Sequence, residues 1–128
     1  MPKGVLVVDD EPYIGLLVKL VLGKRGYEVV LALDAEEALY ASQQHDFDLY
    51  LLDIAMPGMN GFELCKRLKS ASHAEDVPVI MLTARGDERA KLTALAAGAQ
   101  EFITKPFSPK ALQQRVEEII GDPFAREP

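Results

Sequence analysis

The sequence lacks several features that would place the protein in a specialised class. Its single cysteine, Cys65, cannot form an internal disulfide, which is typical of a reducing compartment. No apolar run approaches the roughly 20 residues of a membrane-spanning helix. At the N-terminus, charges follow the first few apolar residues too soon for a signal peptide. We therefore expect a cytoplasmic protein without a membrane segment.

Positive charge is also scarce. The chain has 14 Lys and Arg residues against 20 Asp and Glu residues, which gives a net charge of −6. Direct binding to nucleic acid is disfavoured, because neutralising phosphates requires clustered Lys and Arg. The length of 128 residues and the 48% of hydrophobic residues instead suit one globular domain with a sizeable core.

Strand-like and helix-like segments alternate along the chain. Short apolar runs typical of buried strands cover residues 5–8, 27–32, 48–53, 77–83 and 101–104. Helical patterns are expected over 12–25, from about 35, and over 62–69, 87–97 and 109–120. This alternation predicts an α/β fold, (βα)5, in which helices cover both faces of a doubly wound, parallel five-stranded sheet. With the strand order 2-1-3-4-5, the ligand site is expected between the carboxyl ends of strands 1 and 3.

Acidic residues follow the two strands at that point. The stretch VLVVDDEP (5–12) runs from a buried strand into Asp9, Asp10 and Glu11, and the third strand ends in Asp53. Adjacent carboxylates repel one another unless a cation neutralises them. Oxygen ligands without His or Cys suit a hard cation such as Mg²⁺. Glu11 is interpreted as a charge that favours the N-terminus of the first helix.

Two further strands contribute groups suited to an anion. The fourth strand ends in Thr83, a hydroxyl donor, and Lys105 follows the fifth strand. A metal, a cation and a hydroxyl around one carboxylate are the groups that phosphoryl transfer needs. We therefore predict that Asp53 accepts a phosphoryl group and forms an aspartyl phosphate.

With these residues in place, the chain resembles the receiver domain of two-component response regulators. The resemblance covers about residues 4–121 and leaves 122–128 as a tail that we expect to be flexible. Its motifs are VLVVDDEP (5–12), LLDIAMPGMNGFEL (51–64), PVIMLTA (78–84) and GAQEFITKPF (98–107). It implies a flavodoxin-like receiver fold that serves signalling and is not an enzyme.

The resemblance assigns the metal ligands residue by residue. It implies that Asp10 and Asp53 bind Mg²⁺ directly, together with the backbone carbonyl of Ala55. Asp9 would act mainly through water, and Asp53 would be the phosphoacceptor. Ala55 and Arg85 would border the path of the water that hydrolyses the phosphorylated form.

The resemblance also implies a switch. Thr83 would hydrogen-bond the phosphoryl oxygen, and Lys105, joined to Pro106 by a cis peptide bond, would pair with the phosphate. Phe102 matches the aromatic switch position, where it would turn inward as Thr83 moves. The surface of the fourth helix, fifth strand and fifth helix would then change.

The implied partners are a histidine kinase or a histidine phosphotransfer protein as donor and a downstream protein target or effector domain. A phosphorylation-dependent homodimer is a further hypothesis. A Mg²⁺-dependent phosphatase with an Asp nucleophile is disfavoured, because its second Asp would stand where Ala55 does. A flavodoxin-like cofactor binder would need a phosphate-cradling loop in place of DDEP. A receiver-shaped interaction module that is not phosphorylated remains an alternative.

Overall fold

The computed structural model describes residues 1–84 and 86–125, which form one parallel sheet and its covering helices. The strand order is β2-β1-β3-β4-β5, and every neighbouring pair is parallel. The predicted α/β architecture and strand order are therefore confirmed. The strands are β1 (Gly4–Val8), β2 (Glu28–Ala32), β3 (Leu49–Asp53), β4 (Val79–Thr83) and β5 (Glu101–Thr104). The helices are α1 (Pro12–Lys24), α2 (Ala35–Gln44), α3 (Gly61–Lys69), α4 (Glu88–Ala96) and α5 (Pro109–Ile120).

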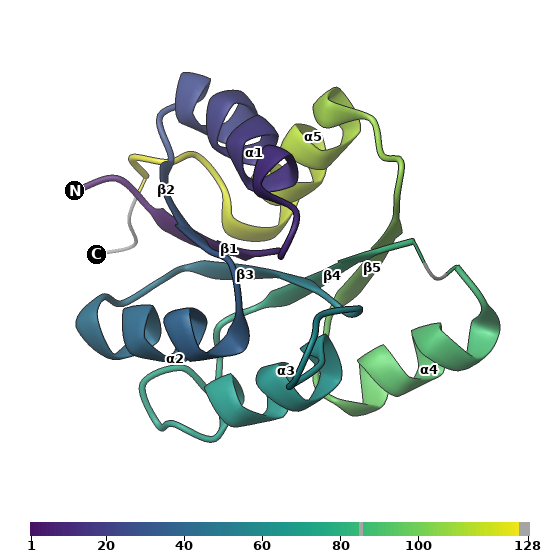
Figure 1. The fold of residues 1–128 in the computed structure, drawn as a ribbon. Coiled ribbons are helices and arrows are strands. Elements are labelled where there is room, and N and C mark those ends of the chain that lie inside the picture. Colours follow the sequence, from purple (N-terminus) through teal and green to yellow (C-terminus); the bar gives the residue numbers. More distant parts are fainter. Residues whose placement is uncertain (85, 126–128) are drawn as a thin grey trace.

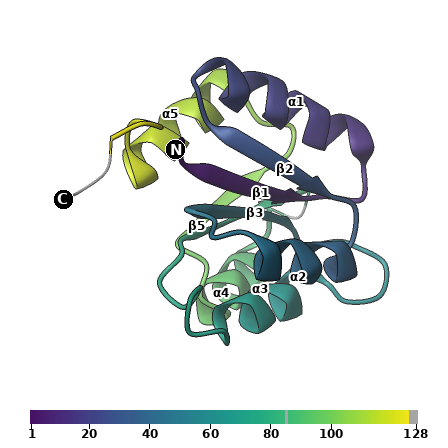
Figure 2. The same ribbon diagram turned by 90° about the vertical axis from the view of Figure 1, so that its left-hand side faces the viewer.

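The helices cover both faces of the sheet. Figures 1 and 2 show α1 and α5 on one face and α2, α3 and α4 on the other. Successive strand residues alternate between the two cores: Leu6 and Val8 pack on the α2–α4 side, whereas Val5 and Val7 pack on the α1–α5 side. All side chains of β3 and β4 are buried, which explains why both sequences are mainly apolar up to their last residues, Asp53 and Thr83.

Strand β4 begins two residues later than the sequence pattern predicts. Pro78 has no N–H to donate to the sheet, so the ladder starts at Val79. The Pro78 carbonyl nevertheless accepts a hydrogen bond from Tyr50 N at 3.0 Å. The proline therefore marks the edge of the strand and still holds it beside β3.

Side-chain caps fix where four of the five helices begin. Asp34, Asn60, Asp87 and Ser108 each accept a hydrogen bond from the backbone N–H three residues further on. Helix α1 differs, because Glu11 stands at its N-cap and makes no side-chain cap bond, while Pro12 opens the first turn. The Glu11 carboxylate is thus available for other contacts.

The segment after α5 returns to the start of β1. Lys3 N donates a hydrogen bond to Pro123 O at 2.8 Å, and the Tyr27 hydroxyl donates to Gly121 O. Pro123 is buried and Phe124 is 64% exposed. The end of the receiver domain at residue 121 stays a prediction, and residues 126–128 of the predicted tail lie outside the described residues.

None of the helices in residues 1–84 and 86–125 is long and apolar enough to cross a membrane.

Candidate functional site

Three carboxylates meet at the carboxyl edge of the sheet. Strands β1 and β3 are neighbours with Val8 opposite Leu52, so the residues that follow them leave the sheet side by side. Asp9, Asp10 and Asp53 each offer an oxygen, and these atoms all lie within 4.8 Å of one another. Asp9 and Asp53 are buried, with 3% and 4% exposed, and Asp10 is exposed. The structure thus brings together the three acids that the sequence singles out.

Lys105 reaches into this acidic cluster from the loop after β5. Its Nζ lies 2.7 Å from Asp9 Oδ2 and 3.5 Å from Asp53 Oδ2. The backbone holds the residue in place, because Lys105 N donates a hydrogen bond to Thr83 O at 2.7 Å. The peptide bond between Lys105 and Pro106 is cis, as the resemblance implies.

The charges in the cluster are not balanced. Burial and the charge of Asp9 raise the pKa of Asp53 from 3.8 to about 6, although Lys105 and a hydrogen bond from Ala55 N act in the opposite direction. For Lys105, burial lowers the pKa, but the hydrogen bond to Asp9 and the nearby carboxylates outweigh burial and raise it. One lysine therefore does not neutralise the acids around it, and an added cation would.

Glu11 belongs to this cluster, which the sequence interpretation did not foresee. Its carboxylate accepts a hydrogen bond from the Tyr13 hydroxyl at 2.7 Å and lies 3.4 Å from Lys105 Nζ. Its backbone N–H donates to Asp9 Oδ1 at 2.9 Å. Glu11 does stand at the start of α1, but its side chain contacts the site. No local pattern signals this contact, because Glu11 and Lys105 are 94 residues apart.

The other predicted residues surround the cluster at different depths. Thr83 is fully buried at the end of β4. Ala55 is exposed, and its N–H donates to Asp53 Oδ1 at 3.3 Å. Phe102 on β5 is half-buried and packs against the core on the α4 side. Arg85 lies outside the described residues.

The loop after β3 is tightly packed against the backbone of the site. Gly61 N donates to Ile54 O at 3.0 Å, and a Cβ on Gly61 would stand 2.2 Å from Asp53 O. Atoms do not approach so closely without a shift of the backbone. Glycine at 61 therefore lets α3 begin directly against the acidic residue.

The donor set fits a hard divalent cation. Asp9, Asp10 and Asp53 supply carboxylate oxygens that converge, and burial together with the charge of Asp9 raises the pKa of Asp53. Mg²⁺ prefers such oxygen ligands and usually binds through one or two carboxylates. The described residues of the cluster contain no sulfur or imidazole ligand.

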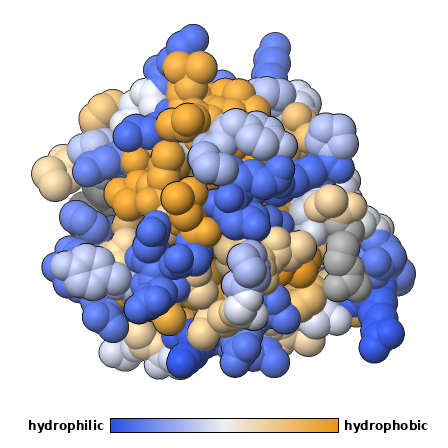
Figure 3. Space-filling view, in the orientation of Figure 1, coloured by the Kyte–Doolittle hydropathy of each residue, from blue (hydrophilic) through white to orange (hydrophobic). Residues whose placement is uncertain are grey.

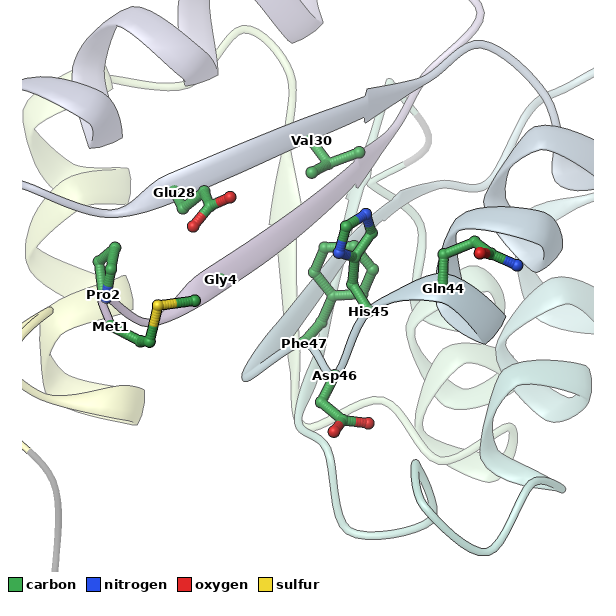
Figure 4. A pocket seen from close by; sticks show the side chains of 9 residues that line it. All are labelled: Met1, Pro2, Gly4, Glu28, Val30, Gln44, His45, Asp46 and Phe47. Atoms are coloured by element: carbon green, nitrogen blue, oxygen red, sulfur yellow. The ribbon is translucent and has the colours of Figure 1, made fainter.

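A second hollow lies at the opposite end of the sheet. It measures about 340 Å³ and is lined by the starts of β1 and β2 and by residues 44–47 (Figure 4). The rings of His45 and Phe47 contact each other edge to face, with centroids 5.8 Å apart. Its polar residues Glu28, His45 and Asp46 are exposed. No buried polar group among these lining residues points to a ligand.

Known proteins share this sequence over nearly its whole length. The chain is 42% identical over 120 residues to the phosphate regulon transcriptional regulatory protein PhoB of Escherichia coli, covering 94% of the chain and 52% of that protein. It is 41% identical over 120 residues to the alkaline phosphatase synthesis transcriptional regulatory protein PhoP of Bacillus subtilis, covering 94% of the chain and 49% of that protein. The chain thus spans about half the length of the curated relatives it matches.

Solved structures share the fold. A chemotaxis protein of Vibrio cholerae superposes with a TM-score of 0.89 at 35% identity, covering 93% of this chain and 99% of that one. A putative response regulator from Chloroflexus aurantiacus gives a TM-score of 0.88 at 38% identity, covering 94% and 98%. The family model of the response regulator receiver domain matches residues 5–117. The chain therefore belongs to the response regulator receiver domains of two-component signalling, a family of signalling domains rather than catalytic enzymes.

Proposed function

We propose that Asp53 accepts a phosphoryl group from the phosphohistidine of a histidine kinase or histidine phosphotransfer protein. The observation that carries this proposal is the position of Asp53. Its buried carboxylate lies beside Asp9 and Asp10 and 3.5 Å from Lys105 Nζ. A nucleophile flanked by a cation site and a fixed lysine is suited to phosphoryl transfer, which depends on positioning and charge neutralisation.

The transfer exchanges one bond to phosphorus for another. An oxygen of Asp53 forms a new P–O bond while the P–N bond to the donor imidazole breaks. The electron pair of that bond stays with the ring nitrogen, and protonation of the ring makes the leaving group a neutral imidazole. Lys105 would stabilise the negative charge on the phosphoryl oxygens. The product is an aspartyl phosphate, in which the Asp53 carboxylate carries the phosphoryl group.

Mg²⁺ is the metal that we propose for the site. Asp10, Asp53 and the backbone carbonyl of Ala55 would hold it directly, and Asp9 would act through water. When bound, it supplies positive charge that offsets the acids and the incoming phosphoryl group. The convergence of the three carboxylates supports this assignment.

Intact-mass spectrometry tests the proposed activity. We expect incubation with acetyl phosphate and Mg²⁺ to add the mass of one phosphoryl group, and EDTA to prevent the addition. Mild alkali should remove the added group, because acyl phosphates hydrolyse readily. A folded protein that gains no mass in repeated short time points would instead support an interaction module that signals without phosphorylation.

Phosphorylation would change the surface formed by α4, β5 and α5. Thr83 would move towards the new phosphoryl group, and Phe102 would turn into the space it leaves. Phe102 is half-buried and its ring has no hydroxyl to anchor it, so packing alone would hold either position. A downstream protein or effector domain would read this change. We expect the domain to act in the cytoplasm, where it would not bind nucleic acid itself.

The donor protein is expected to bind beside α1. Hydrophobic side chains gather over α1 and β2 (Figure 3). Leu16 on α1 and Leu33, which follows β2, are 60% and 44% exposed. Leu16, Leu33 and Asp9 line one hollow, so this apolar patch adjoins the acidic cluster. Exposed apolar patches with polar rims mark interaction sites.

Replacing Leu16 by alanine separates donor binding from chemistry. We expect Leu16→Ala to slow transfer from a histidine phosphotransfer protein about threefold to tenfold, the effect of truncating an interface residue that contributes about 1 kcal/mol. Phosphorylation by acetyl phosphate should stay unchanged, because the small donor does not need the patch. Tyr40→Ala serves as a control for an exposed aromatic residue on α2. Equal slowing with both donors would contradict this role.

We also propose a phosphorylation-dependent homodimer that forms through α4, on the face of the sheet opposite α1 (Figure 1). Helix α4, which contacts β5, exposes Leu92 and Leu95, which are 59% and 46% exposed. Burying these side chains against a second copy would stabilise association. Sedimentation velocity with beryllofluoride and Mg²⁺ checks the proposal. An increase in sedimentation coefficient that Leu92→Ser removes is expected, and an unchanged coefficient would contradict it.

A further inference from the structure

Glu11 and Tyr13 contact the site but have no part in the mechanism proposed above. Tyr13 Oη donates a hydrogen bond to Glu11 Oε2 at 2.7 Å, and Glu11 Oε1 lies 3.4 Å from Lys105 Nζ. Glu11 stands at the N-cap position of α1 and Tyr13 lies in the first turn of that helix, whereas Lys105 follows β5. The three side chains form a chain of contacts that ends on the lysine beside Asp53.

Lys105 is shared among three carboxylates. Its Nζ makes a hydrogen bond of 2.7 Å to Asp9, and it lies 3.4 Å from Glu11 and 3.5 Å from Asp53. The Asp9 contact is fixed, because the other oxygen of Asp9 accepts the Glu11 N–H at 2.9 Å. Glu11 and Asp53 therefore compete for the same ammonium group at nearly equal distances.

Tyr13 determines where the Glu11 carboxylate lies. The Glu11 side chain is 45% exposed, so water competes for its oxygens. The hydroxyl of Tyr13 occupies one of them and directs the other towards Lys105. Tyr13 is 63% exposed, and its hydroxyl therefore orients Glu11 without a role in the core.

From these contacts we infer that Glu11, held by Tyr13, restrains Lys105 and slows the phosphorylation of Asp53. The restraint acts through the lysine: Glu11 competes with Asp53 for the ammonium group of Lys105, so less of its positive charge is available to the phosphoryl group at Asp53. Both residues are positioning residues, because they act through Lys105. The inference rests on the proposed phosphorylation of Asp53.

Phosphorylation rates of four proteins test the inference. Acetyl phosphate and saturating Mg²⁺ are added to the wild type, Glu11→Gln, Tyr13→Phe and the double variant. Intact-mass spectrometry of quenched samples then gives the phosphorylated fraction at each time point. We expect Glu11→Gln to be about two- to fivefold faster, the range that one partly exposed ion pair provides. Tyr13→Phe should be accelerated less. The double variant should match Glu11→Gln, because Tyr13 acts only through Glu11.

Two further variants separate the contact from the charge. Glu11→Asp keeps the charge but shortens the side chain, so it should be as fast as Glu11→Gln. Glu36→Gln removes an exposed charge in the first turn of α2 and should keep the wild-type rate. A series of acetyl phosphate concentrations separates donor affinity from the maximal rate, and the freeing of Lys105 predicts a gain in the maximal rate.

The outcomes are distinguishable. A wild-type rate in Glu11→Gln, an equal gain in Glu36→Gln, a wild-type rate in Glu11→Asp, or additive effects in the double variant would each overturn the inference. A wild type that gains no phosphoryl group, while remaining folded, would instead refute the proposed function on which the inference rests.

Discussion

Replacing Asp53 by asparagine is expected to abolish phosphorylation by acetyl phosphate. The amide is a poor nucleophile, and both oxygens of Asp9, the other buried carboxylate of the cluster, already accept hydrogen bonds from Lys105 and from the Glu11 N–H. Intact-mass spectrometry of Asp53→Asn should therefore show no added phosphoryl group at any time point. The expected loss is complete, because no positioning of the donor can compensate for the missing nucleophile.

Matched variants distinguish the acceptor from its supporting residues. Asp10→Asn should still be phosphorylated, but only at higher Mg²⁺ concentrations, because it removes a proposed ligand and leaves the nucleophile. Asp76→Asn, an exposed carboxylate after α3, should behave as the wild type. An adduct that persists in Asp53→Asn would assign the phosphoryl group to another residue.

The same substitution is expected to stabilise the metal-free protein at alkaline pH. In the folded chain, burial and the charge of Asp9 raise the pKa of Asp53 from 3.8 to about 6. Moving the pKa this far costs the ionised folded form about 3 kcal/mol. Asparagine carries no charge at any of these pH values. In EDTA at pH 8, Asp53→Asn should therefore be more stable than the wild type by up to about 3 kcal/mol.

The direction of the pH dependence follows from the two pKa values of Asp53. Between 3.8 and about 6, the folded state holds a proton that the unfolded state has released, so raising the pH through this window destabilises the wild type. Below pH 3.8 both states are protonated, and the advantage of Asp53→Asn should disappear. Above about pH 6, ionised Asp53 destabilises the folded wild type by the full amount.

Urea unfolding in EDTA at pH 8 and pH 4 measures this difference, with Asp76→Asn as the control for an exposed charge. Adding Mg²⁺ at pH 8 should raise the stability of the wild type more than that of Asp53→Asn, because ligand binding to the folded state stabilises it. Equal stability of the wild type and Asp53→Asn in EDTA at pH 8 would show that the cluster imposes no electrostatic cost.

Asp53 and Lys105 therefore respond in opposite ways to the charges of the metal-free site. Asp53 is costly to ionise without a cation, whereas Lys105 gains from every carboxylate around it. A site built in this way favours the binding of Mg²⁺, because the cation offsets the charge of the acids and, in the proposed reaction, that of the phosphoryl group. Glu11 places one more carboxylate beside Lys105, and we infer that it makes the lysine less available to the phosphoryl group.

Local sequence patterns determine most of the fold. Alternating apolar strands and capped helices predict the (βα)5 architecture, because a parallel strand can be joined to the next only by a crossover, and short apolar runs need burial on both faces. The same pattern predicts that Asp9, Asp10 and Asp53 converge, since residues that follow parallel strands leave the sheet at one edge. Strand β4 begins two residues later than predicted, because Pro78 cannot donate a hydrogen bond to the sheet.

Only the tertiary structure decides how the charges in the site are shared. The sequence places Glu11 at the start of α1 and Lys105 after β5. It does not show that these side chains contact each other, because the two residues are 94 positions apart in the chain. Whether a carboxylate stabilises a helix end or pairs with a lysine depends on distances of a few ångströms between elements that the sheet brings together. The raised pKa of Asp53 arises in the same way, because burial and the charge of Asp9 act through space and leave no local pattern in the chain.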